Sequence, residues 1–163
     1  MKIYLAGSCA PEQRNLMVTI AKYIRQTLED FCLNNNAVFC PFELNIPNAW
    51  DMSQEEWSKK VFEADKAAID NCDLFLMISQ GRISSAGTNW EQGYAYGIDK
   101  KTAVIQITDE PTSLMSYVGC DVFVNSNKED LFQKIDLILS LYIESKITDG
   151  TFCYRPACET VLT

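Results

Sequence analysis

The sequence predicts an α/β fold in which a parallel sheet of five strands carries helices on both faces. Two observations lead to this prediction: short apolar runs alternate with longer segments, and in those segments apolar residues recur every three or four positions. Strands that alternate with helices form right-handed βαβ units, which place the strands parallel and the helices on both faces of the sheet. The length of 163 residues is typical of one domain.

Five short apolar runs are the predicted strands, at residues 2–7, 37–41, 73–79, 102–108 and 120–125. The first run, KIYLAG, ends in a glycine that leads into a loop. The third run, DLFLMIS, is apolar enough to be covered on both faces, as a central strand of a parallel sheet is.

The two longest segments between the first three strands have a helical period. Glu12–Leu33 carries apolar residues on one face and is followed by the turn signal of residues 34–36. In the next segment, Ser53 and Glu56 have capping-box spacing at the start of a helix. The predicted buried stripe of this second helix is Trp57, Val61, Ala64 and Ala68.

The second half of the chain contains two further predicted helices. One follows the GRISSAG loop and ends near Gly97, and the other is Asp130–Ser145. Residues 109–117 are predicted to be a loop. Residues 148–163 lack any period and are either a mobile tail or an arm that packs on a neighbouring subunit. We therefore expect one domain over residues 1–147 and a tail over 148–163.

The composition excludes several classes of function. With 14 Lys and Arg against 22 Asp and Glu, the net charge is −8, which would repel a nucleic-acid polymer. The lack of histidine removes Ser/His/Asp triads, Cys/His dyads and the usual catalytic zinc ligand sets, so no metal is expected. The seven cysteines contain no CxxC pair and are expected to be reduced. Without a membrane-spanning run or a signal-peptide layout, we expect a cytoplasmic protein that has no membrane partner.

Parallel sheets of this kind bind ligands outside the carboxyl ends of their strands. Four segments follow those ends, at residues 7–14, 42–50, 81–91 and 110–119. In the third, a turn containing Gly87 leads directly into a helix, whose free N–H groups favour an anion. This turn has neither the Walker sequence nor the GxGxxG spacing of a dinucleotide site.

Glu91 is a candidate site residue in the first turn of that helix. A purely structural interpretation is also open, because Thr88 and Glu91 have capping-box spacing and an acid there stabilises a helix by about 0.3–1 kcal/mol. The functional interpretation rests on Trp90, Tyr94 and Tyr96, which would give a fixed carboxylate apolar walls suited to a small ring-containing ligand.

Asp65 is the second candidate, because it shares or borders the apolar stripe of its helix, where an unpaired carboxylate is costly. It is either a satisfied buried acid or a carboxyl with a raised pKa that acts as a general acid.

Four segments together carry a resemblance to a known family: KIYLAG, the Asp65 helix that leads into CDLFLM, GTNWEQGYAYG at 87–97 and PTSLMSYVGCDVFVN at 111–125. In order and spacing they resemble the nucleoside 2-deoxyribosyltransferases and the related nucleoside 5′-monophosphate N-glycosidases, over about residues 1–145. The resemblance implies a flavodoxin-like fold, an assembly built from dimers, no cofactor, and a catalytic domain at residues 1–147 that cleaves the bond between a nucleobase and C1′ of deoxyribose.

The resemblance also implies roles for three catalytic residues. Glu91 matches the nucleophile, which forms a glycosyl ester as in retaining glycosidases. Asp65 matches the acid that exchanges a proton with the nucleobase, and Tyr4 matches the tyrosine whose hydroxyl orients the nucleophile. The resemblance implies a further set of substrate-binding residues: Gly7, Asn45, Ser85, Gly87, Trp90, Ser113 and Met115.

Two of these positions depart from the transferase pattern. Ser85 replaces an acid that holds the sugar 5′-hydroxyl, and Ser113 replaces an asparagine in a stretch donated by the neighbouring subunit. The monophosphate N-glycosidases use serines at both positions to hold a 5′-phosphate, which a carboxylate would repel. The expected function is transfer of deoxyribose between nucleobases, with hydrolysis of a 2′-deoxynucleoside 5′-monophosphate as the alternative. The partners would be a nucleoside or nucleotide and a free nucleobase.

Two other classes of protein remain open at this point. The same pocket in a non-catalytic nucleotide-binding module would hold its ligand without using Glu91. A flavodoxin-type electron carrier would have the same predicted fold and a similar acidic charge.

Overall fold

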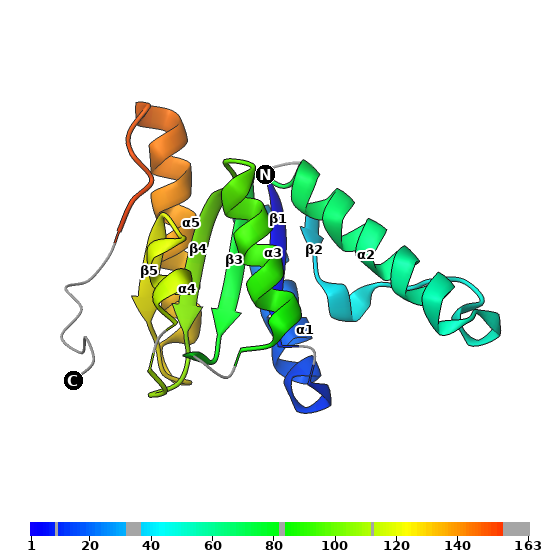
Figure 1. The fold of residues 1–163 in the computed structure, drawn as a ribbon. Coiled ribbons are helices and arrows are strands. Elements are labelled where there is room, and N and C mark those ends of the chain that lie inside the picture. Colours follow the sequence, from blue (N-terminus) through cyan, green and yellow to red (C-terminus); the bar gives the residue numbers. More distant parts are fainter. Residues whose placement is uncertain (9, 32–36, 82–83, 112, 155–163) are drawn as a thin grey trace.

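The computed structural model describes residues 1–8, 10–31, 37–81, 84–111 and 113–154 (Figure 1). The described strands form one parallel sheet in the order β2-β1-β3-β4-β5, which confirms the predicted fold class. They are β1 (Lys2–Gly7), β2 (Ala37–Phe39), β3 (Leu74–Ser79), β4 (Lys101–Gln106) and β5 (Val122–Asn125). The strand order reverses beside β1, so the carboxyl ends of β1 and β3 lie at the switch point where such folds bind ligands.

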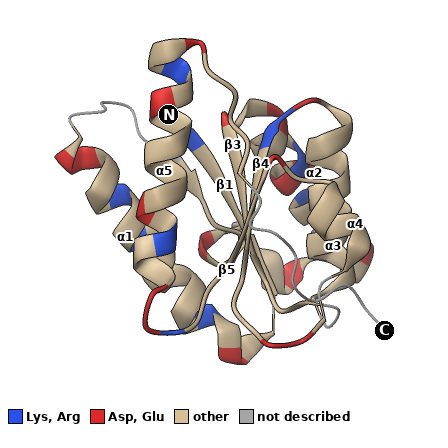
Figure 2. Cartoon of the chain, turned by 90° about the vertical axis from the view of Figure 1, so that its left-hand side faces the viewer, with Lys and Arg blue, Asp and Glu red and all other residues tan. Residues whose placement is uncertain are grey.

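Helices cover both faces of this sheet (Figure 2). α1 (Arg14–Asp30) and α5 (Leu131–Thr148) pack on one face, with buried side chains such as Ile24 and Ile138. α2 (Gln54–Asn71), α3 (Ala86–Gly97) and α4 (Leu114–Val118) lie on the other face. The arrangement is flavodoxin-like, with the sheet as the middle of three layers.

The alternation of side chains along β1 decides which of them face α2 and α3. Ile3 and Leu5 belong to the core under α1 and α5. Tyr4 and Ala6 point to the opposite face and belong to the core under α2 and α3. Tyr4 is therefore buried on the side of the sheet that carries both candidate carboxyls.

Several predicted boundaries shift in the structure. α1 begins at Arg14, after a 3₁₀ turn at Pro11–Gln13, and ends at Asp30; the turn signal at 34–36 lies outside the described residues. β2 ends at Phe39, because Pro41 begins another 3₁₀ turn and proline cannot donate to the strand ladder.

The prediction of a loop throughout residues 109–117 is wrong, because α4 begins at Leu114. A helix of five residues is too short to show a period in the sequence. The neighbouring helix α3 stabilises α4: the Gln92 side chain donates to the carbonyls of Ser116 and Gly119 at 2.9 and 3.0 Å.

The capping box of Ser53 and Glu56 is confirmed at the start of α2, but the predicted buried stripe is wrong at its first member. Trp57 is 46% exposed, and Val61, Ala64 and Ala68 are only partly buried. The reason is visible in Figure 1: the first half of α2 extends past the β2 edge of the sheet, so it has no sheet beneath it to bury that stripe.

The end of the described chain packs on its own domain. Phe152 is buried against Tyr142 of α5, with their ring centroids 5.6 Å apart. Tyr154 pairs with β5: its N–H donates to the Asp121 carbonyl at 3.2 Å, and its carbonyl accepts from Phe123 at 2.8 Å. Residues 155–163, which complete the predicted tail, lie outside the described residues.

Candidate active site

Glu91 is positioned by the start of α3. The helix begins at Ala86 and its N-cap is Ser85, whose hydroxyl oxygen accepts from the Thr88 N–H at 3.2 Å. The alternative in which Thr88 and Glu91 form a capping box is therefore wrong, and Glu91 lies in the second helical turn rather than the first. Since Glu91 does not cap the helix, the structural interpretation of this acid loses its basis.

A chain of hydroxyl contacts ties this helix start to β1. The Thr88 hydroxyl donates to the Gly7 carbonyl at 2.8 Å and lies 2.6 Å from the Ser85 hydroxyl. A carbonyl only accepts, so the one hydroxyl proton of Thr88 goes to Gly7. Ser85 must then donate its own proton to Thr88, and in this arrangement it has no proton left for a ligand.

Tyr4 holds the Glu91 carboxyl from the sheet. Its ring is stacked between Phe39 of β2 and Phe75 of β3, with each pair of ring centroids 5.4 Å apart. The Tyr4 side chain interacts with the Glu91 carboxyl and lowers its pKa. Because the ring is fixed by strands on both sides, the hydroxyl is presented to Glu91 in a defined position.

Glu91 and Asp65 form an interacting pair of carboxyls. Burial and the nearby charge of Asp65 raise the pKa of Glu91 to about 7. The interaction with Tyr4 opposes this rise. Burial raises the pKa of Asp65 to about 6, and its buried Oδ1 atom has no hydrogen-bond partner among the described residues. Two interacting carboxyls release their protons in steps that belong to the pair, so near neutral pH the site holds both a carboxylate and a proton donor.

Local contacts and burial act in opposite directions on the two carboxyls. The Tyr4 interaction favours the charged form of Glu91, and the unpartnered buried Oδ1 atom of Asp65 favours the protonated form of that acid. Burial and the Asp65 charge outweigh the Tyr4 interaction and give Glu91 the higher pKa of the two.

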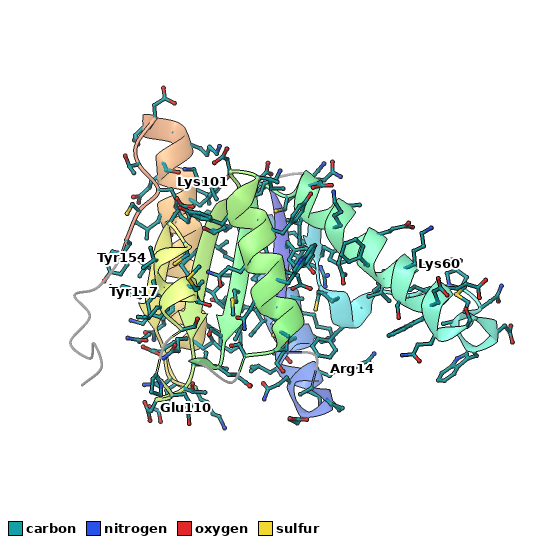
Figure 3. The ribbon with its side chains drawn as sticks, in the orientation of Figure 1. Arg14, Lys60, Lys101, Glu110, Tyr117 and Tyr154 are labelled. Atoms are coloured by element: carbon teal, nitrogen blue, oxygen red, sulfur yellow. The ribbon has the colours of Figure 1, made fainter. Side chains whose placement is uncertain are left out.

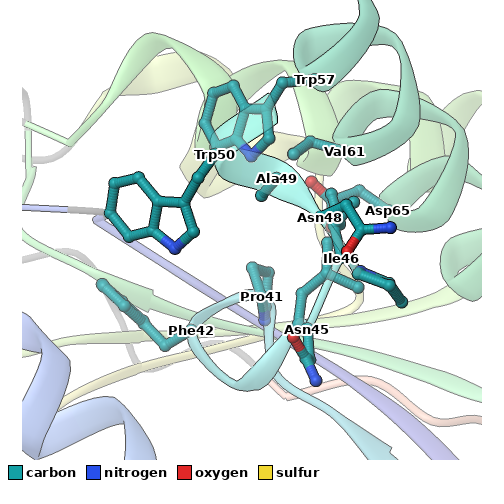
Figure 4. Close-up of a pocket in the computed structure, with 12 residues that line it drawn as sticks. Pro41, Phe42, Asn45, Ile46, Asn48, Ala49, Trp50, Trp57, Val61 and Asp65 are labelled. Atoms are coloured by element: carbon teal, nitrogen blue, oxygen red, sulfur yellow. The ribbon is translucent and has the colours of Figure 1, made fainter. Parts of the chain in front are cut away.

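A cavity of about 570 Å³ has Asp65 in its wall, whereas Glu91 and Tyr4 are not among its lining residues (Figure 4). Its apolar walls include Phe42, Trp50 and Trp57 from the loop after β2 and the start of α2. Trp50 is fully exposed, so its ring is free to cover a ligand. A cavity with aromatic walls and one titratable group suits a flat heterocycle.

The structure brings some of the predicted binding residues to this region and not others. Asn45 lines the cavity together with Asp65, and Gly7 is buried where β1 ends. Gly87 lies exposed in the first turn of α3. Trp90 is not among the residues that line the cavity, and its ring packs on Phe62 of α2 and Tyr94 of α3.

The two predicted binding residues of α4 are also outside the cavity. Ser113 is the residue before the helix, and its hydroxyl does not cap it. Met115 is 83% exposed. Within one chain, neither residue is among those that line the cavity.

Sequence reasoning did not single out Trp50 and assigned Trp57 to the core. One signal pointed to Trp50, since it lies in a segment that follows the carboxyl end of a strand. No comparable signal existed for Trp57, because its helical spacing is that of an ordinary buried stripe.

Charged side chains lie at both ends of the strands. Figure 3 shows Arg14 and Glu110 toward the carboxyl ends of the strands, and Lys101, the first residue of β4, toward their amino ends. Within the described ranges, no three or more Cys, Asp or Glu side chains gather in a way that could hold a metal ion. None of the helices in the described part of the chain is long and apolar enough to cross a membrane.

Fold and site together define a parallel α/β domain with a pair of carboxyls at its topological switch point. The chain belongs to the nucleoside 2-deoxyribosyltransferase family, whose model matches residues 3–144. Members of this family are enzymes that cleave N-glycosidic bonds, as transferases or hydrolases, and they act on nucleosides or nucleotides and nucleobases. The family predicted from the four sequence segments is thus confirmed.

Solved structures give the same fold. A 2-deoxyribosyltransferase from Bacillus psychrosaccharolyticus has 26% identity and a TM-score of 0.64, over 83% of this chain and 90% of that chain. The CMP N-glycosidase of Clostridium botulinum has 24% identity and a TM-score of 0.52, over 84% and 98%. A conserved protein of Enterococcus faecalis V583 has 20% identity and a TM-score of 0.61, also over 84% and 98%. The last two support the fold alone. No curated protein matches this chain.

Proposed function

We propose that this protein is a nucleoside 2-deoxyribosyltransferase that uses Glu91 as its nucleophile and Asp65 as its acid. The observation that carries the proposal is the arrangement of three groups from three elements: the Glu91 carboxyl of α3, the Tyr4 side chain of β1 that lowers its pKa, and the Asp65 carboxyl of α2 whose charge raises it. The family assignment and the related transferase structure support it.

The first half of the reaction forms a covalent intermediate. A Glu91 oxygen attacks C1′ of the deoxyribose, and the C1′–N bond breaks with its electron pair left on the nucleobase. The Asp65 proton passes to the base nitrogen as the base leaves. The products of this step are a glycosyl ester on Glu91, a neutral free base and an ionised Asp65.

The second half regenerates the enzyme. A nitrogen of a second nucleobase attacks C1′ of the ester, and the Glu91 carboxylate leaves. The proton lost by the incoming base passes to Asp65, which restores the starting state. Two displacements at one carbon retain its configuration.

The cavity supports the assignment of a nucleobase as the group next to Asp65. Phe42, Trp50 and Trp57 provide flat apolar surface on which a heterocycle can stack. Asn45 on the same wall offers an amide that can both donate to and accept from a base edge. Asp65 then lies where a departing base needs its proton.

Hydrolysis of a 2′-deoxynucleoside 5′-monophosphate is the second candidate. Ser85 and Ser113 favour it, because neither carries the charge that would repel a phosphate. The Ser113 hydroxyl is not used to cap α4, whereas the Ser85 proton is already donated to Thr88. Ser85 would have to turn its hydroxyl away from Thr88 to donate to a phosphate. This requirement favours deoxyribosyl transfer over hydrolysis of a monophosphate.

The test is to incubate the protein with deoxyadenosine and with dAMP, each with and without cytosine, and to separate the products by chromatography. Transfer predicts deoxycytidine only when cytosine is present. Hydrolysis predicts adenine and deoxyribose 5-phosphate from dAMP without cytosine.

A Glu91→Gln variant is the control for both reactions, and it should lose at least about 10³-fold in turnover while it still binds substrate. A variant that kept more than about a tenth of the wild-type turnover would remove Glu91 as the nucleophile. Substrate binding without any turnover by the wild-type protein would instead favour a binding module.

A further inference from the structure

Two side-chain interactions between β1 and α3 involve residues three positions apart in each element. Tyr4 of β1 interacts with Glu91 of α3, as described above. Three residues further along β1, the Gly7 carbonyl accepts from Thr88, which lies three residues before Glu91 in α3. The first contact involves the proposed nucleophile, and the second fixes the same helix to the same strand one turn closer to its start.

The second contact is well protected from solvent. Thr88 is only 2% exposed, and its hydrogen bond to Gly7 is buried. The orientation of the Thr88 hydroxyl is also fixed, because it receives the Ser85 proton and must give its own to the carbonyl. A buried hydrogen bond with a fixed direction is suited to holding two elements at one relative position.

We propose that Thr88 is a positioning residue: its hydroxyl bond to Gly7 sets the position of α3 on β1 and so keeps the Glu91 carboxyl against the Tyr4 hydroxyl. The role assigned to Glu91 rests on the proposed function, but the contact itself does not. Thr88 acts through Glu91 and needs no contact with substrate.

Loss of this hydroxyl affects geometry more than folding. Valine has the same shape as threonine but cannot donate, so the Gly7 carbonyl loses this donor and α3 is free to shift on the strand. A small misplacement of a nucleophile is enough to lower the rate greatly. The groups that act on Glu91 are Asp65 from α2 and Tyr4 from β1. If α3 shifts so that Glu91 moves away from Tyr4, burial and the Asp65 charge remain, and both raise the pKa of Glu91.

The experiment compares Thr88→Val with Thr88→Ser, which keeps the hydroxyl. The matched control is Thr19→Val, since the Thr19 hydroxyl also donates to a backbone carbonyl, that of Asn15, at 2.7 Å, but on the exposed side of α1. Two quantities are measured: kcat and KM for deoxyribosyl transfer, and the titration of the Glu91 carboxyl by carbon NMR, which needs no turnover.

For Thr88→Val we expect a kcat about tenfold lower, with KM changed less than about threefold. The titration midpoint of Glu91 should move upward by about half a pH unit or more, because the interaction with Tyr4 that lowers the pKa of Glu91 is weakened. Thr88→Ser and Thr19→Val should match the wild type in both measurements.

The proposal would be overturned if Thr88→Val kept the wild-type kcat and the wild-type titration of Glu91. It would also be overturned if Thr88→Ser were as impaired as Thr88→Val, because Thr88→Ser keeps the hydroxyl and loses only the methyl group. If Thr88→Val does not fold, Thr88→Ala takes its place, and the Thr88→Ser result still decides between hydroxyl and methyl. An inactive wild-type protein would refute the proposed function alone, because the NMR titration would still test the position of Glu91.

Discussion

Asp65 on α2 and Glu91 on α3 lie close enough that the charge of one raises the pKa of the other. Both are partly buried, and burial is the largest cause of the raised pKa of each. Such a pair is costly to fold with both charges present, and a shared proton relieves that cost. The same shared proton is what cleavage of a glycosidic bond requires, so stability and function are linked at this site.

The first prediction concerns stability against pH. The pKa of Glu91 rises from its usual 4.5 to about 7 on folding, so between those values the folded protein binds more protons than the unfolded chain. Stability therefore falls as pH rises through this window. Glu91→Gln removes the charge and should be more stable than the wild type by on the order of 1–3 kcal/mol at pH 8.

Urea unfolding at pH 4.5 and pH 8 checks this prediction. The gain in the free energy of unfolding should be largest at pH 8 and nearly absent at pH 4.5, where Glu91 is protonated in the folded protein. The same gain at both pH values would show that the benefit of Gln does not come from the buried charge.

The second prediction concerns the acid. Asp65→Asn cannot donate a proton to the leaving base and should lower kcat about 10²-fold or more on deoxyadenosine. The loss should be much smaller for 7-methyl-2′-deoxyguanosine, because its base carries a positive charge and leaves without protonation. Steady-state kinetics on both substrates provides the measurement. An equal loss on the two would assign Asp65 to binding or structure instead of proton transfer.

The third prediction concerns the 5′ group of the substrate. Ser85→Asp places a carboxylate at the start of α3, where Asp is also a good N-cap, so the helix should still form. A negative charge there should lower kcat/KM for dAMP by at least about tenfold, equivalent to 1.4 kcal/mol, and affect deoxyadenosine much less. Competition of the two substrates in one assay measures the ratio directly. Equal losses of kcat/KM on the two substrates would show that Ser85 has no role in binding the 5′-phosphate.

The fourth prediction concerns assembly. Ser113 and Met115 match a stretch that reaches a neighbour's pocket, and in the single chain they lie outside the cavity, while Leu114, Met115 and Val118 are all more than half exposed. Activity per subunit should therefore fall on dilution together with the oligomer. Sedimentation under assay conditions, with turnover followed at the same concentrations, makes the comparison. A fully active monomer would show that each chain has a complete site.

Much of this protein was determined by its sequence alone. The period of each segment predicted the strands and long helices, because burial of one face requires apolar residues at a fixed spacing. Four segments together, including those around Asp65 and Glu91, were enough to identify the family. The rule that ligands bind at the carboxyl ends of parallel strands also predicted the loop with Asn45, which lines the cavity.

Only the tertiary structure decided how these side chains are held. The resemblance implied that Tyr4 acts on Glu91, but the stacking that fixes the Tyr4 ring between Phe39 and Phe75 depends on strand pairing, which no local pattern encodes. Trp57 has the spacing of a core residue but lines a cavity, because α2 extends past the sheet. Local spacing records which face of an element is apolar, whereas contacts between distant segments depend on how the elements pack in three dimensions.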